Sequence, residues 1–246
     1  MIHPSVRAAF VPFSVRFEGS VPWLYQDCRG LVTAAVGVLC DPLELALDTL
    51  DGHMIRASDG QPATRHEIAA DWQAIKRHPD LARRGHRAAE SVAWLRLTPE
   101  GLEAVTLRKL DAMVAQLARR FPALASWPAS AQLAVLSLAW ACGAGFRFPR
   151  TERALLARDW TTAAEEGVID ATGNPGVVPR NAANRALWLA AAHVEAHGLD
   201  PAELLWEPPA EVPYLTDYDR QRALDLVTYT LNASVVEGLD EARRGR

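Results

Sequence analysis

The spacing of apolar residues predicts a helix at the N-terminus of this chain. Four apolar side chains of segment 4–18 recur at intervals of three and four: Val6, Phe10, Phe13 and Phe17. That spacing is the period of an amphipathic helix. Gly19 follows directly, and a glycine at this place is typical of a helix end. Glu18 is therefore expected at the helix C-terminus, where the helix dipole disfavours a negative charge.

The next segment changes to a β pattern. Residues 23–39 read WLYQDCRGLVTAAVGVL, and their β-branched residues favour an extended chain over a helix. The run Cys28-Arg29-Gly30 separates two such stretches and predicts a turn. We therefore expect a hairpin with Asp27 at the end of its first strand or in the turn, and with Thr33 on its second strand.

The rest of the chain is predicted to be mostly helical. Thr64 followed by Glu67 is a capping box and predicts a helix start, and Thr98-Pro99 predicts another. Residues 79–91 are polar and are predicted to form a loop. Segment 131–142 is apolar on nearly all sides and predicts a buried central helix. Further helices are expected over 151–167 and 181–197.

A proline-rich stretch near residue 208 divides the chain into two parts. We expect one domain over residues 1–200, followed by a linker and a C-terminal helical appendage over 201–246, where a helical stripe covers 214–238. The fold class expected from these elements is α+β and mainly α.

Composition excludes several classes of function. The net charge of −4 indicates no basic surface for nucleic acid, so nucleic acid is not an expected partner. No apolar run approaches the roughly 20 residues that span a bilayer, so no stable membrane association is expected. The N-terminus lacks the features of a signal peptide, so we expect synthesis in the cytoplasm without a cleaved leader.

The cysteines and histidines suggest neither a metal site nor a cofactor. Cys28, Cys40 and Cys142 are odd in number and have no metal-ligand spacing. We expect buried or half-buried thiols, because free cysteine is commonly buried. A disulfide between Cys28 and Cys40 is the alternative.

Glu18 and Asp27 are candidate catalytic carboxylates. Glycoside hydrolysis uses one carboxylic acid and one carboxylate, whose environments must differ. Glu18 follows an apolar helix and suits the protonated group, whereas Asp27 beside an exposed turn suits the ionised one. The Thr33 hydroxyl could hold a water molecule against Asp27. The alternative is a solvated Glu18 and a turn-forming Asp27, and the spacing alone leaves both interpretations open.

This stretch resembles the phage-type lysozymes, the muramidase family of phage endolysins and their bacterial relatives. The matching residues are, in chain order, Glu18, Gly19, Tyr25, Asp27, Gly30 and Thr33. The chain departs from the family pattern at two positions of the hairpin. Ala35 stands where the family has a glycine, although Gly37 keeps the next one, and Val38 stands where a polar residue is usual.

Further similarities follow in the family's order along the chain. LSLAWACGAGF (136–146) resembles the family's buried central helix, with Trp140 at the position of a cleft aromatic residue. Asn184-Arg185-Ala186 resembles the start of its closing helix. The resemblance extends over about residues 5–197, within which residues 42–97 fit loosely and are similar to an insertion.

The resemblance implies a lysozyme-like fold, with a small N-terminal β-hairpin lobe, a larger helical lobe and a cleft between them. It implies a muramidase that hydrolyses, with inversion, the β-1,4 bond between N-acetylmuramic acid and N-acetylglucosamine in peptidoglycan, without cofactor or metal. Glu18 would be the general acid, Asp27 the general base and Thr33 the residue that holds the water. The implied substrate-binding residues are Tyr25, Gly37, Trp140 and Arg185, the last also as partner of Glu18.

The expected partner is therefore the peptidoglycan glycan strand, in the periplasm of the producing cell or of a target cell, with an unidentified delivery or immunity partner. Ala35 and Val38 favour one alternative, a catalytically weakened relative that binds glycan or a partner. A lytic transglycosylase is another, although it needs no Asp27 or Thr33. Trp140 could equally be a core residue, and Arg185 a surface residue.

Overall fold

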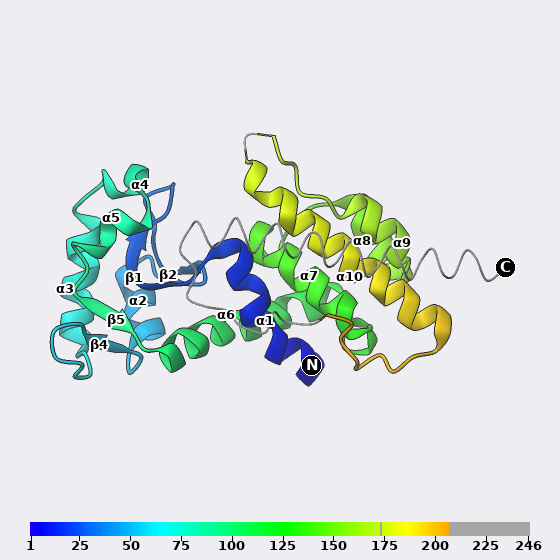
Figure 1. Ribbon diagram of the computed structural model, residues 1–246, viewed down its shortest axis with the longest axis horizontal. Helices are drawn as coiled ribbons and strands as arrows, with labels where there is room; N and C mark the ends of the chain where they lie inside the picture. Colours follow the sequence, from blue (N-terminus) through cyan, green and yellow to red (C-terminus); the bar gives the residue numbers. More distant parts are fainter. Residues whose placement is uncertain (173, 207–246) are drawn as a thin grey trace. The chain divides into compact units, whose positions relative to one another are not determined.

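The computed structural model describes residues 1–172 and 174–206, which fall into two compact units (Figure 1). One unit is Glu18–Lys109, and the other combines Met1–Phe17 with the chain from Leu110 onward. The described residues are mainly helical with small antiparallel sheets, which confirms the predicted α+β, mainly α class. The appendage predicted over 214–238 lies outside the described residues.

The unit Glu18–Lys109 is built on a three-stranded antiparallel sheet. Its strands are β1 (Val21–Gln26), β2 (Val32–Ala35) and β3 (Val38–Leu39), paired in that order. The predicted hairpin is confirmed as β1 and β2. The third strand is added because the chain reverses at Gly37, whose φ of 71° lies in the left-handed region that glycine adopts readily.

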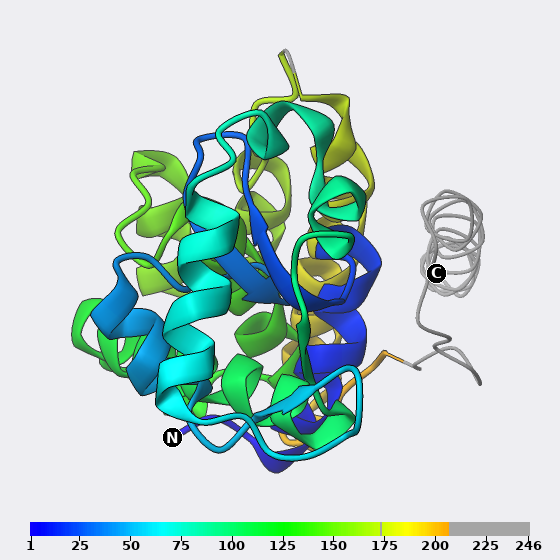
Figure 2. The same ribbon diagram turned by 90° about the vertical axis from the view of Figure 1, so that its left-hand side faces the viewer.

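Helices and a second small sheet complete this unit. The helices are α2 (Leu43–Leu50), α3 (Arg65–Lys76), α4 (Leu81–Arg84), α5 (His86–Glu90) and the first half of α6 (Pro99–Arg120). The second sheet pairs β4 (Met54–Arg56) with β5 (Leu95–Leu97). Helix α3 packs against β1 and β2, as the two ribbon views show (Figures 1 and 2).

The prediction of a loop over residues 79–91 was wrong. This segment forms α4 and α5, and both helices pack against β1. Leu81 and Ala89 are the buried contacts, although arginines surround them in the sequence. Two isolated apolar residues are too few to show helical periodicity, so only the packing against the sheet explains these helices.

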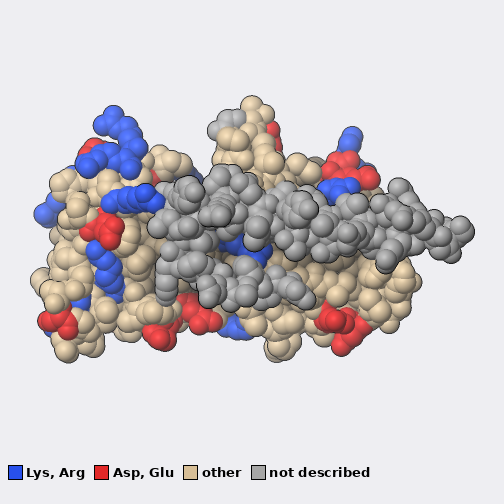
Figure 3. All heavy atoms as spheres, viewed as in Figure 1, with Lys and Arg blue, Asp and Glu red and all other residues tan. Residues whose placement is uncertain are grey.

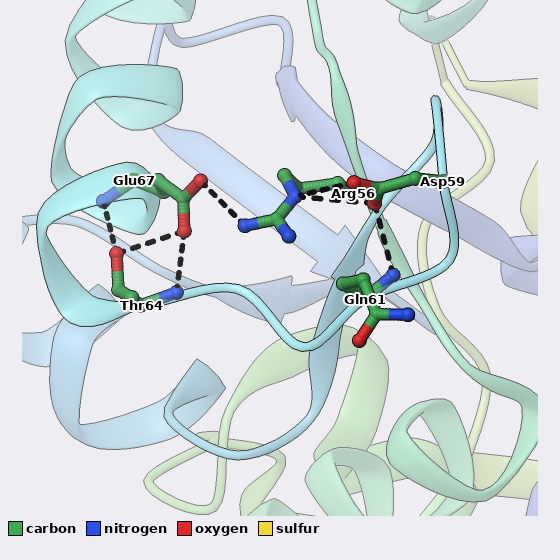
Figure 4. A network of polar contacts seen from close by, with 5 residues as sticks. All are labelled: Arg56, Asp59, Gln61, Thr64 and Glu67. Carbon is green, nitrogen blue, oxygen red and sulfur yellow. Dashed lines mark hydrogen bonds and ion pairs between the residues drawn. The ribbon is translucent and has the colours of Figure 1, made fainter.

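A network of polar side chains fixes the start of α3 (Figure 4). Thr64 Oγ1 accepts the N–H of Glu67 at 3.2 Å, and Glu67 Oε2 accepts the N–H of Thr64 at 2.8 Å. The predicted capping box is therefore confirmed. Glu67 also accepts a bond from Arg56 at 3.1 Å, and Arg56 pairs with Asp59, which accepts the N–H of Gln61. The network joins the helix start to β4.

Helix α3 also carries a carboxyl group that is completely buried. Asp71 Oδ1 accepts the N–H of Trp94 at 3.0 Å, and Asp71 Oδ2 has no hydrogen-bond partner in the described parts of the chain. Burial raises the pKa of Asp71 to about 6, against the opposing effects of the N–H groups of Trp94 and Leu95 and the charge of Arg96.

We expect Asp71 to make the protein less stable as the pH rises from about 4 to about 6. Its pKa is 3.8 when unperturbed and about 6 in the fold, so the folded state binds more protons in this window. The free energy of unfolding therefore falls with rising pH, by about 3 kcal/mol for a shift of about two units. Urea unfolding at pH 4 and pH 7 should show that the wild type loses about this much stability relative to Asp71→Asn over the interval, since the other carboxyl groups are common to both proteins. Equal pH dependence of the two proteins would contradict the prediction.

The other unit is helical and is centred on α7 (Ala129–Cys142). The surrounding helices are α1 (Pro4–Glu18, of which the last residue belongs to the first unit), the second half of α6, α8 (Pro149–Ala157), α9 (Trp160–Glu166) and α10 (Val178–His197). Two short 3₁₀ helices, η1 (Leu124–Ser126) and η2 (Pro175–Val177), connect them. The buried central helix is confirmed, because α7 packs against α10 and is buried from Ala129 through Trp140.

Two helices occupy the predicted helical range 151–167. Helix α8 ends because Arg158 adopts a left-handed conformation with a φ of 57°. Asp159 then begins α9 by accepting the N–H of Thr162 at 3.0 Å, which is an N-cap contact. A left-handed residue followed by a capping aspartate is thus the local reason for the break.

Trp206, the last residue described, is anchored in the helical unit. Its ring lies 5.4 Å from that of Phe13 and 4.7 Å from the guanidinium of Arg16. Burial lowers the pKa of Arg16 to about 10. The segment predicted to be a linker therefore begins with packed chain as far as residue 206. Within residues 1–172 and 174–206, no helix is both long and apolar enough to cross a membrane.

Candidate active site

Asp27 lies in the turn between β1 and β2, and its side chain organises that turn. Asp27 Oδ1 accepts the N–H groups of Arg29 at 2.8 Å and of Leu31 at 2.9 Å. The backbone closes the same turn, because Asp27 N donates to Leu31 O and Gly30 N donates to Asp27 O, both at 2.9 Å. Asp27 therefore has the turn-forming role that the sequence left open. The two bonds to its Oδ1 also fix the direction of the carboxylate.

The register of the sheet brings two predicted site residues directly opposite each other, Tyr25 on β1 and Thr33 on β2. Asp27 follows β1 by one residue, and the bond from its N–H to Leu31 O extends the pairing by one step. If the alternation of side chains continues over this step, Asp27 is on the face of Tyr25 and diagonal to Thr33.

Thr33 is nearly buried, and its hydroxyl already has one partner. The side chain donates from Oγ1 to Leu31 O at 3.2 Å, and the residue is 5% exposed. A hydroxyl that donates one bond keeps its lone pairs as acceptors. Thr33 can therefore still accept a hydrogen bond from a water molecule.

Glu18 is half-buried and is the last residue of α1. Gly19 ends the helix with a φ of 71°, and β1 begins two residues later at Val21. Glu18 is thus at the helix C-terminus, as the sequence predicts. The three predicted catalytic residues and Tyr25 all belong to the unit Glu18–Lys109.

The end of β2 holds Ala35, one of the two positions at which the chain departs from the lysozyme pattern. Ala35 has a φ of 53° and is 1% exposed, so a buried alanine occupies the left-handed region. That conformation costs an L-residue about 1–2 kcal/mol, which is the physical reason to favour glycine there. Gly37 follows, and its carbonyl oxygen accepts a bond from Lys109 Nζ at 2.8 Å. The backbone is glycine-like at Ala35 despite the substitution.

The remaining two predicted site residues belong to the helical unit. Trp140 is 7% exposed and packs edge-on against Phe10, with ring centroids 5.0 Å apart. This burial supports the core interpretation of Trp140. Arg185 is exposed on α10, whereas its neighbours in the matched tripeptide, Asn184 and Ala186, are buried.

Arg180 is the arginine of α10 that the fold buries. It is 3% exposed, donates from Nη1 to Ser137 O at 3.2 Å, and its guanidinium lies 4.8 Å from the ring centre of Phe17, the residue before Glu18. The sequence does contain a signal for this burial. Arg180 shares a helical stripe, at spacings of three and four, with four buried residues: Ala183, Asn184, Leu187 and Ala191.

Basic residues collect at one end of the unit that carries Asp27. Figure 3 shows Lys and Arg side chains over the end formed by α4 and α5, where Arg83, Arg84 and Arg87 are exposed. Tyr25 lies beside this segment, with its ring 6.0 Å from that of His86. This local charge can attract an acidic polymer although the whole chain carries a net charge of −4.

The cysteines differ from the expectation. All three are free, so the alternative disulfide between Cys28 and Cys40 is not formed. Cys40 is buried, as expected, and burial raises the pKa of its thiol to about 12. Cys28 and Cys142 are exposed, because one lies in the β1–β2 turn and the other ends α7.

The hairpin thus carries one carboxylate and one hydroxyl, and the preceding helix end carries a second, half-buried carboxyl group. Carboxyl groups of this kind can serve as general acid and general base. No known protein-family model matches this chain, and a search of curated proteins likewise found no significant match.

Proposed function

We propose that this protein is a peptidoglycan hydrolase, a muramidase with a lysozyme-like fold. The observation that supports the proposal is the pairing of Tyr25 with Thr33 in the strands next to the turn in which Asp27 Oδ1 accepts the N–H groups of Arg29 and Leu31. These residues and Glu18 have the spacing that resembles the phage-type lysozymes. The substrate would be the β-1,4 bond between N-acetylmuramic acid and N-acetylglucosamine.

In the proposed reaction, Glu18 donates a proton to the glycosidic oxygen as the bond from that oxygen to the anomeric carbon breaks. A water molecule held between Asp27 and Thr33 attacks the anomeric carbon from the opposite face. Asp27 accepts the proton that this water loses, so the product has inverted configuration. Inverting enzymes keep the two carboxyl groups about 6.5–9.5 Å apart to leave room for the water.

The other proposed roles concern binding of the glycan. Tyr25, two residues before Asp27, could pack against a sugar ring, and Gly37 turns the chain between β2 and β3. Arg185 is exposed and can contact a ligand. Trp140 is buried, so it could contact a sugar only after a rearrangement that exposes its ring. The acidic peptide stems of peptidoglycan also suit the basic segment at α4 and α5. The protein would act on the cell wall, in the periplasm of its own or of a target cell.

Product analysis tests this proposal directly. The full chain is incubated with purified sacculi, and the released fragments are separated and identified by mass. We expect fragments with reducing N-acetylmuramic acid ends, whose configuration, read early by NMR, is inverted. Anhydro ends would instead indicate a lytic transglycosylase. Binding to sacculi without release of fragments would indicate the weakened, glycan-binding relative, and either result would overturn the proposal.

A further inference from the structure

The C-terminal turn of α3 contacts the β1–β2 hairpin on both sides of Asp27. On one side, Gln26 donates from Nε2 to Ile75 O at 2.7 Å in a buried contact. On the other side, Lys76 donates from Nζ to Gly30 O at 2.9 Å. Two consecutive residues of one helix thus hold the two ends of the turn that carries Asp27.

Lys76 also makes an ion pair that extends this contact to β2. Its Nζ lies 2.5 Å from Asp41 Oδ2, and the same oxygen accepts the N–H of Val32 at 3.0 Å. Partial burial would raise the pKa of Asp41, but the bonds from Lys76 and Val32 outweigh burial and hold this pKa below its ordinary value. The ammonium therefore joins the turn at Gly30 to the strand after it.

The Lys76 ammonium also lies over an aromatic ring. Its Nζ lies 5.8 Å from the ring centre of Trp72, one helical turn earlier on α3. Trp72 is in turn fixed by a bond from Nε1 to Cys40 O at 2.7 Å. The lysine side chain is only 36% exposed. The Lys76 ammonium thus has two acceptors, one carbonyl oxygen and one carboxylate oxygen.

We propose that Lys76 is a positioning residue for Asp27: it holds the β1–β2 turn against α3, and thereby sets the direction of the Asp27 carboxylate. The turn backbone fixes Asp27 through the N–H groups of Arg29 and Leu31, and Lys76 fixes that backbone at Gly30. Segment 42–97, which fits the lysozyme pattern only loosely, would then contain a residue that positions the general base. The catalytic consequence rests on the proposed muramidase function, whereas the effect on the turn does not.

The test compares Lys76→Met with Lys76→Arg. Methionine removes the ammonium and keeps an unbranched side chain, whereas arginine can still donate to both Gly30 O and Asp41. The matched control is Arg77→Met, which removes one positive charge from the residue that follows α3; Arg77 is exposed, and its side chain donates to Gln73 Oε1. All proteins are assayed well below their unfolding temperatures.

The first measurement does not involve activity. Hydrogen exchange of the Arg29 and Leu31 amides, followed by NMR, should be at least about 10-fold faster in Lys76→Met, since these amides report on the turn. The exchange rate of these two amides should return to the wild-type value in Lys76→Arg and should not change in Arg77→Met. Amides of α7 should not change in any variant. Unchanged exchange at the turn in Lys76→Met would overturn the proposal, whatever the activity of the wild type.

The second measurement separates positioning from general stability. Misplacement of a reacting group by about 1 Å can cost about 100-fold in rate, so kcat on soluble glycan should fall about 10–100-fold in Lys76→Met. KM should change by less than about 3-fold, and Lys76→Arg should recover most of kcat. A kcat that falls only in proportion to the unfolded fraction would overturn the proposal. A wild type that does not cleave peptidoglycan would overturn the proposed function, and the exchange measurement would still decide the role of Lys76 in the turn.

Discussion

Replacement of Glu18 with glutamine is expected to reduce peptidoglycan cleavage by about 10²–10⁴-fold while leaving the fold intact. Glutamine has the size and shape of glutamate, but its amide cannot supply a proton to the leaving oxygen. Glu18 ends α1 and is only half-buried, so the exchange removes no large packing contact. The rate of fragment release from sacculi measures the effect, and thermal unfolding checks the fold.

Asp27→Asn is the companion variant, and the turn makes it informative. The asparagine oxygen can still accept the N–H groups of Arg29 and Leu31, so the turn should persist without the general base. We expect the same loss of cleavage at nearly unchanged stability. Asp27→Ala would lose both the turn contacts and the base.

The matched control for both variants is Glu44→Gln, because Glu44 is an exposed carboxylate on α2 in the same unit. It should retain wild-type activity. Cleavage by Glu18→Gln and Asp27→Asn at the rate of this control would rule out the assignment of both residues, even if the protein itself degrades peptidoglycan.

The largest effect on stability is expected for Trp188→Ala, at about 3–5 kcal/mol. Trp188 is completely buried on α10, and its ring is stacked on that of Trp160, with centroids 6.2 Å apart and an interplanar angle of 3°. Trp127 packs edge-on against Trp160 at 5.2 Å. Truncation would leave a cavity of indole size in a cluster that joins η1, α9 and α10.

Urea unfolding of Trp188→Ala measures this loss, with Trp94→Ala as the control. Trp94 undergoes the same chemical change but is 38% exposed in the other unit, so its truncation should cost clearly less. Trp188→Phe should lie between the wild type and Trp188→Ala, because an aromatic ring fills part of the space. A cost below about 1 kcal/mol for Trp188→Ala would show that the cluster can collapse around the missing side chain.

Local patterns along the chain were sufficient wherever a structure depends on residues that are close in sequence. The capping box at Thr64, the helix end at Gly19 and the turn after Asp27 are all made by groups within four residues of one another. The buried helix α7 was predictable because it is apolar on almost every side. Glu18 and Asp27 could be named as candidate carboxylates from the sequence because their spacing, with Gly30 and Thr33, resembles that of the phage-type lysozymes.

Contacts between distant segments could not be read from the sequence. Helices α4 and α5 contain too few apolar residues to show a helical period in the sequence. They form because Leu81 and Ala89 pack against β1. Likewise, the sequence resemblance selected Arg185 on α10, but the fold buries Arg180, since only the packing of α10 on α7 decides which face turns inward.

The sequence by itself therefore determined the β1–β2 hairpin, the buried helix α7 and the start of α3, together with the residue types of the candidate site, because short-range hydrogen bonds and hydrophobic periodicity are encoded locally. Only the tertiary structure decided how the Asp27 carboxylate is held. Its turn is bound by Gln26 to Ile75 and by Lys76 to Gly30, contacts that join residues almost 50 positions apart. Such contacts depend on where α3 packs on the sheet, and no local pattern carries that information.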